Sequence, residues 1–181
     1  MKENNIFRMK ILLVLMGLFA SVSVFSQSSK DNELINDSKE AKVQFVKTDS
    51  LMQSLFDNSY GYVIFPNVGK GAIGVGGAAG NGIVFENGKP VGSAKLKQVT
   101  VGFQFGGQVY REVIFFENKA ALDRFKDGNF EFSAQASAVA ATVGASANVK
   151  YRDGVLVFTQ EKKGLMYEAS IGGQKFGYTA F

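Results

Sequence analysis

From Tyr60 to the end of the chain, apolar and polar residues alternate with a period of two. The alternation is clearest in three segments, residues 99–105, 130–138 and 139–149. A strand with one buried face shows this period, because successive side chains point to opposite sides of a sheet. The pattern predicts roughly eight to ten half-buried antiparallel strands.

Two segments follow helical spacing instead. The first begins with a capping pattern, Asp37 followed three residues later by Glu40, and continues with apolar residues three or four positions apart. We predict one amphipathic helix over residues 38–56. In the second, residues 118–128, Asn118 can cap a short helix and Gly128 can end it.

Turn residues and small residues complete the fold prediction. Asn87-Gly88 and Asp153-Gly154 tolerate the positive φ of a hairpin turn. Glycine and alanine dominate residues 74–80, which favours a strand that a backbone, helix or ligand approaches closely. We predict an α+β fold, mainly antiparallel β: a compact twisted sheet or barrel-like sandwich with an N-terminal amphipathic helix and one short inserted helix.

The first 26 residues have the layout of a secretory signal. Basic residues precede an uncharged apolar run over residues 11–25, and Ser26 offers a small side chain for cleavage. The run is shorter than the roughly 20 residues that span a bilayer, although an uncleaved anchor is the alternative. We expect a signal peptide (1–26), a flexible leader (27–36) and a single domain (37–181). The protein is then exported to the periplasm or the cell exterior, or is peripheral to the outer membrane.

The missing residue types exclude several classes of site. The chain contains no Cys and no His, which excludes disulfides, Cys- or His-based zinc sites and Ser-His-Asp triads. The carboxylates, Glu112 and Asp123 among them, show no paired nucleophile and base. We expect no enzymatic activity, no cofactor and no metal. A net charge of +4 is too small for a nucleic-acid partner.

Residues 69–74 match the pattern G-x-G-x-x-G of dinucleotide-binding proteins. Such a motif opens a helix whose N-terminus receives the pyrophosphate. Residues 75–82 contain too much glycine to form that helix. We interpret the segment as a glycine-rich strand and expect no nucleotide.

The candidate binding residues are four lysines in or near the predicted strands. Lys70 lies in the glycine-rich segment, Lys89 at a hairpin tip, and Lys95 and Lys97 on one face of a strand. At a common rim, each would contribute about 1 kcal/mol at an anionic lipid surface. The alternative is that lysines at edges and turns only solubilise the sheet.

Several motifs in a fixed order carry a family resemblance. Gly61-Tyr62-Val63-Ile64-Phe65-Pro66 is followed by regularly spaced glycines as far as Gly82. The later segments are a Gly/Gln-alternating block (101–108), an apolar strand (113–116), a helix (118–125), a small-residue strand (134–147) and a closing segment (170–173). Over residues 38–178 the chain resembles the SYLF lipid-binding domain family.

The resemblance implies a mainly β domain with helices that binds phospholipid, including phosphoinositides in eukaryotic members, some of which also bind actin. Bacterial relatives are typically exported and small. Residues 92–95, Gly-Ser-Ala-Lys, stand where the family often carries Trp-Ser-x-Pro, and the loss of that Trp and Pro weakens the case for a headgroup or interface contact from this loop. Lys70 is the candidate lysine inside a matched motif.

Together these observations predict a non-catalytic phospholipid-binding protein of the cell envelope. It would contact a phospholipid or a membrane surface through an apolar surface or groove with a lysine rim. The alternative is an integral outer-membrane eight-stranded β-barrel, which the alternation and the terminal Phe181 allow.

Overall fold

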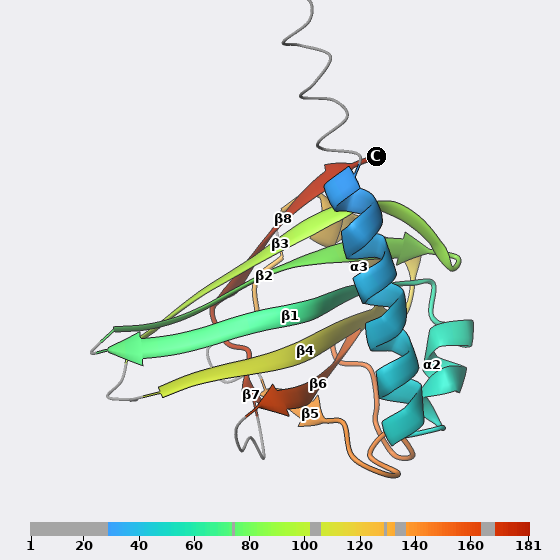
Figure 1. Cartoon of the computed structure of the whole chain (residues 1–181). Coiled ribbons are helices and arrows are strands. Elements are labelled where there is room, and N and C mark those ends of the chain that lie inside the picture. Colours follow the sequence, from blue (N-terminus) through green and yellow to red (C-terminus); the bar gives the residue numbers. More distant parts are fainter. Residues whose placement is uncertain (1–28, 74, 102–105, 129, 133–136, 164–168) are drawn as a thin grey trace, which may run out of the picture. The chain divides into compact units, whose positions relative to one another are not determined.

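A computed structural model describes residues 29–181 except 74, 102–105, 129, 133–136 and 164–168 (Figure 1). The chain divides into two units, residues 1–33 and 34–181, and the packing below is that of the second unit. The predicted signal peptide lies outside the described residues.

The helices are residues 29–48, α2 (Met52–Asn58) and α3 (Lys119–Lys126). The strands are β1 (Gly61–Ile73), β2 (Val75–Glu86), β3 (Lys89–Val101), β4 (Gly106–Phe116), β5 (Ser137–Ala140), β6 (Val155–Lys163), β7 (Ala169–Ser170) and β8 (Gln174–Ala180). They form an eight-stranded sheet in the order β7-β5-β6-β4-β1-β2-β3-β8. The β5–β6 pair is parallel and the other named pairs are antiparallel. The predicted α+β fold class is confirmed.

The central strands bury both faces. Tyr62 and Ile64 of β1 belong to a core that includes Phe45 of the first helix and Phe56 of α2, which we call the helix-side core. The rings of Phe56 and Tyr62 meet edge to face, with centroids 5.0 Å apart. Figure 1 shows residues 34–48 of the first helix, which belong to the second unit, crossing the face of the central strands.

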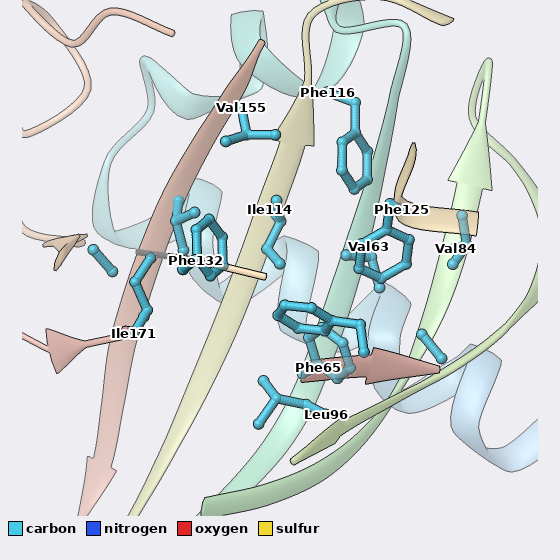
Figure 2. Packing of buried hydrophobic residues seen from close by; sticks show 14 of the residues in the cluster. Val63, Phe65, Val84, Leu96, Ile114, Phe116, Phe125, Phe132, Val155 and Ile171 are labelled. Atoms are coloured by element: carbon cyan, nitrogen blue, oxygen red, sulfur yellow. The ribbon is translucent and has the colours of Figure 1, made fainter. Parts of the chain in front are cut away.

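The opposite face of β1 carries Val63 and Phe65. They pack with Leu122 and Phe125 of α3 in a second core, the α3-side core (Figure 2). Burial on both faces explains the apolar run from Tyr62 to Phe65, because neither side of this part of β1 faces water.

The sheet curls so that its last strand lies over the α3-side core. β8 is three positions from β1 in the strand order. Phe176 of β8 nevertheless contacts Phe65 of β1, with ring centroids 5.9 Å apart, and Phe125 of α3, at 5.1 Å. Strand twist accumulated over neighbouring pairs produces this curvature.

The N-terminal helical region differs from the single helix predicted over residues 38–56. The first helix begins at residue 29, so residues 29–36, expected as a loose leader, are helical. It ends at residue 48 and α2 follows. Asp49 lies at the break, where its carboxylate accepts the N–H of Leu51 at 3.1 Å. A short polar side chain that bonds nearby backbone in this way favours a helix end.

The strand expected over residues 139–149 is wrong beyond β5, because residues 141–150 form turns and irregular backbone. Gly144 has a φ of 74°. Asp49 accepts the N–H and the hydroxyl of Ser146 at 2.8 and 2.7 Å, which fixes the loop. Ala145 and Val149 pack against the helix-side core, so the alternation there reflects a packed loop.

The predicted hairpin turn at Asn87-Gly88 and the inserted helix are confirmed. Asn87-Gly88 joins β2 to β3, whereas Asp153-Gly154 forms a tight turn that is closed by an isolated bridge between Arg152 and Val155 and has irregular backbone before it. Both turns have φ values between 51° and 77°. In α3, the side chain of Asn118 accepts the N–H of Ala121 at 3.0 Å, and Gly128 follows with a φ of 72°. Turns and helix caps depend on residues that are only a few positions apart, so they can be predicted from the sequence.

Candidate functional site

Three lysines gather on one exposed face of β3 and β8. Lys95 and Lys97 alternate with the buried Leu96, so both lie on one face of β3, as predicted, and this face is exposed. Lys97 pairs across the strands with Lys175, and Lys95 pairs with Gly177. Directly opposed residues share a face of a sheet. Lys175 was not among the predicted residues, although its position one residue before the buried Phe176 indicates an outward side chain.

Small residues extend this surface onto the neighbouring strands. Lys97 pairs with Ala79 of β2, and Ala79 pairs with Gly69 of β1. Two residues beyond Lys97, Val99 is 74% exposed. We call the surface formed by Gly69, Ala79, Lys95, Lys97, Val99, Lys175 and Gly177 the lysine face.

The glycines of the sheet fall into two groups. A Cβ at Gly82 would lie 2.5 Å from the carbonyl oxygen of Ile64, and one at Gly80 would lie 2.9 Å from that of Asn67. These positions confirm the expected close approach of backbones. At Gly69 and Gly177 a Cβ would meet nothing within 4 Å. The glycines of the lysine face are therefore not required by internal packing.

The lysine face keeps most of its positive charge. Among the described residues, Lys175 forms an ion pair with Glu131 at 3.7 Å, and both side chains are more than half exposed. An exposed pair of this length contributes little, because water screens both charges.

The structure separates the other two candidate lysines from this face. Lys70 pairs with Ala78, whose side chain belongs to the α3-side core, so Lys70 lies on the opposite face. A register shift between Phe65 and Val68, next to Pro66, reverses the alternation along β1. Without it, Lys70 would share the face of Lys97.

Lys89 lies at the far end of β3, where it pairs with Glu86 across the hairpin. Eight positions separate Lys89 from Lys97, which corresponds to about 26 Å along a strand. The four predicted lysines therefore do not form one rim, whereas Lys95 and Lys97 do share a surface.

The molecule also buries a carboxyl group. Glu112 of β4 and Gln174 of β8 both have no exposed surface. The side-chain amide of Gln174 donates to Oε2 of Glu112 at 3.0 Å. Burial raises the pKa of Glu112 to about 7, although the Gln174 hydrogen bond acts in the opposite direction. Burial also raises the pKa of the nearby Tyr110, and the charge of Glu112 adds to that effect.

Two further findings concern the described residues. These residues contain no group of three or more Asp or Glu side chains arranged to hold a metal ion. Within the same residues, each helix is too short or too polar to cross a bilayer.

Comparison with known proteins places the chain in a family. Residues 97–178 match the Ysc84 family model, described as Las17-binding protein actin regulator. The beta cell expansion factor A of Aeromonas veronii is 32% identical over 124 residues, which are 67% of this chain and 47% of that protein. The match thus spans about half the length of this curated relative. The segment that matches the family model, residues 97–178, contains Lys97, Glu112 and Lys175. The chain belongs to the Ysc84, or SYLF, family.

Proposed function

We propose that the protein is a non-catalytic phospholipid-binding protein of the cell envelope that contacts anionic lipid through the lysine face. The observation that carries the proposal is the alignment of Lys95, Lys97 and Lys175 on one open surface beside the exposed Val99. Family membership supports a binding role. The predicted signal peptide supports export to the periplasm or cell exterior.

The spacing of the charges suits a layer of phosphate groups. Lys95 and Lys97 are two residues apart on one strand, about 7 Å, and Lys97 and Lys175 are opposed at about 5 Å. Each lysine near an anionic bilayer contributes about 1 kcal/mol. Three on one face therefore supply about 3 kcal/mol at low ionic strength.

The small residues suit a flat partner. Gly69 and Ala79 project little beyond the backbone, so this part of the sheet can approach headgroups closely. Val99 adds an apolar side chain at the same surface. Partial insertion of such a side chain gains about 0.8 kcal/mol per buried CH₂ group.

The partners that the family description names, Las17 and actin, belong to other members of the family. Our proposal requires only an anionic lipid surface. The lysine face, with its small side chains, has the charge and flatness for that partner.

Co-sedimentation with lipid vesicles tests the proposal. We expect the purified protein to pellet with vesicles of phosphatidylcholine and phosphatidylglycerol, to stay in solution with phosphatidylcholine alone, and to be released by salt. The double variant Lys97→Gln/Lys175→Gln should bind about thirtyfold more weakly, because it removes two contributions of about 1 kcal/mol.

The matched control is Lys70→Gln/Lys89→Gln, which removes the same charge from other surfaces. It should change binding less than about twofold, since these residues lie away from the lysine face. Equal loss in both double variants would contradict the proposed surface. Absence of binding to anionic vesicles would contradict the function.

A further inference from the structure

Glu112 and Gln174 connect two strands that are not neighbours in the sheet. β4 lies between β1 and β6, whereas β8 lies at the end of the strand order. The 3.0 Å hydrogen bond from Gln174 to Oε2 of Glu112 therefore bridges the interior of the curl. Oε1 of Glu112 and Oε1 of Gln174 have no hydrogen-bond partner among the described residues. Both groups present an acceptor, so a proton on Glu112 would provide the missing donor.

The groups facing Glu112 do not neutralise a negative charge. Phe65 of β1 and Thr159 of β6 are its direct neighbours in the sheet, and Gln174 faces it from β8. The titratable groups beside them on this face are Tyr110 and Glu161, which pair across β4 and β6. Both are neutral or negative, so neither stabilises an ionised Glu112.

The basic residue Lys70 shares this face, but it pairs with Gln108, four positions along β4 from Glu112. That is about 13 Å of strand. Gln98 of β3, the strand partner of Gln174, donates to the carbonyl of Gly172 at 2.8 Å. An ionised Glu112 in the closed sheet is thus a buried charge without a close cation.

β8 covers an apolar cluster. Phe176 contacts Phe65, Phe125, Phe130 and Phe132, with ring centroids 5.1 to 5.9 Å apart. These five residues form the phenylalanine cluster, in which Phe176 belongs to β8 and the other four rings lie under that strand. Movement of β8 away from β3 would therefore uncover them.

We propose that Glu112 and Gln174 form a proton-dependent clasp, in which ionisation of Glu112 releases β8 and uncovers the phenylalanine cluster. Release of β8 is the least costly way to hydrate the carboxylate. This seven-residue strand lies at the end of the strand order, where it pairs with β3 and makes one isolated bridge, between Lys175 and Glu131. Local opening of such an edge element costs less than unfolding of the central strands. β4 is held by β1 on one side and β6 on the other.

The released state offers an apolar site beside Lys95 and Lys97, which remain on β3 when β8 moves, because Leu96 between them belongs to the α3-side core. An acyl chain is the ligand class that matches a cluster of phenylalanine rings. This last step rests on the proposed function. The clasp itself does not require lipid, and we test it without lipid.

Hydrogen–deuterium exchange of the lipid-free protein follows the release of β8. With exchange corrected for intrinsic rates, we expect β8 amides to exchange about twentyfold faster at pH 7.5 than at pH 5.5. The Glu112→Gln variant should keep slow exchange at both pH values, because an amide resembles the protonated acid and pairs with Gln174. The control Glu117→Gln removes an exposed carboxyl at the end of the same strand and should behave like the wild type.

Two results would overturn the clasp: exchange in β8 that does not change with pH, or a pH dependence that survives in Glu112→Gln. If that variant does not fold, ¹³C NMR titration of the Glu112 carboxyl in the wild type decides. An ordinary acidic midpoint would refute the proposal, and a midpoint near 7 would support it. A pH-dependent clasp without lipid binding would refute only the proposed function.

Discussion

Lys97 of β3 and Lys175 of β8 lie directly opposite each other on the exposed face of the sheet. Like charges at opposed positions destabilise an antiparallel pair, because the side chains lie about 5 Å apart. In the proposed complex, a bound anion would remove this repulsion, so the pair would favour binding of phosphate groups.

Replacing one lysine of this pair should stabilise the free protein. We expect Lys97→Gln to increase the free energy of unfolding by about 0.5 kcal/mol at low salt, and by less at high salt. Urea denaturation at two salt concentrations measures this. Lys95→Gln is the control, because Lys95 faces Gly177 and has no opposed charge. An equal gain in both variants would show that net charge, and not the opposed pair, controls stability.

The parts of the fold that depend on neighbouring residues were predictable. The hairpin at Asn87-Gly88 and the helix cap at Asn118 are encoded within a few positions. The outward positions of Lys95 and Lys97 follow from the period of a strand. The loop around Ser146 was not predictable in this way. Its small apolar residues alternate with polar ones in the pattern of a strand. Its conformation instead depends on a hydrogen bond from Ser146 to Asp49, which is 97 positions away in the sequence.

The candidate site was predictable only in part, for two physical reasons. Lys175 lies opposite Lys97 because β3 and β8, which are distant in sequence, pair in the sheet. The alternation of apolar and polar residues predicts strands but not which strands pair. Lys70 lies on the opposite face because the register shift at Pro66 adds a residue to β1. A bulge of this kind reverses the side of every residue beyond it.

The two groups of glycines should respond differently to alanine. A Cβ at Gly82 would clash with the carbonyl of Ile64 and with the ring of Phe65, so Gly82→Ala should lower the free energy of unfolding by about 1–3 kcal/mol. Gly69 faces open space, and Gly69→Ala should change the free energy of unfolding by less than about 0.5 kcal/mol. Urea denaturation of the two variants measures the difference. A large loss at Gly69 would contradict the open lysine face.

Asp49 should hold the 141–150 loop onto the first helix. Its buried carboxylate accepts three hydrogen bonds, from Leu51 N–H and from the N–H and hydroxyl of Ser146. Burial by itself raises the pKa of Asp49, but the hydrogen bonds together lower it by a larger amount. The pKa of Asp49 is therefore below the ordinary value of 3.8. Asp49→Ala should cost about 1–3 kcal/mol, measured by urea denaturation at neutral pH.

The exposed Asp57 provides the control for this change, and Asp57→Ala should be nearly neutral. Because the pKa of Asp49 is lowered, its contribution to stability is present above pH 3.8 and declines as the pH falls through the folded-state value. Equal effects of the two variants would contradict the assigned role of Asp49.

Glu112 should make the protein less stable as the pH rises. Its pKa is about 7 in the folded chain and 4.5 ordinarily, so the folded state binds more protons between these values. The free energy of unfolding should fall by about 3 kcal/mol from pH 4.5 to 7 and level off above. Urea denaturation across this range should show the decline in wild type and lose it in Glu112→Gln. An unchanged slope in the variant would assign the dependence to another group.

Two exposed valines distinguish the proposed binding surface from the rest of the molecule. Val99 belongs to the lysine face, and Val143 lies in the 141–150 loop. They are 74% and 90% exposed, so an acidic substitution at either should leave stability nearly unchanged. Val99→Asp removes an apolar contact and adds a negative charge at the membrane, and should weaken binding to anionic vesicles at least tenfold, a change of about 1.4 kcal/mol. Val143→Asp should bind like the wild type in the same co-sedimentation assay. Loss of binding in Val143→Asp alone would move the membrane contact to the loop, and the lysine face would then need another partner.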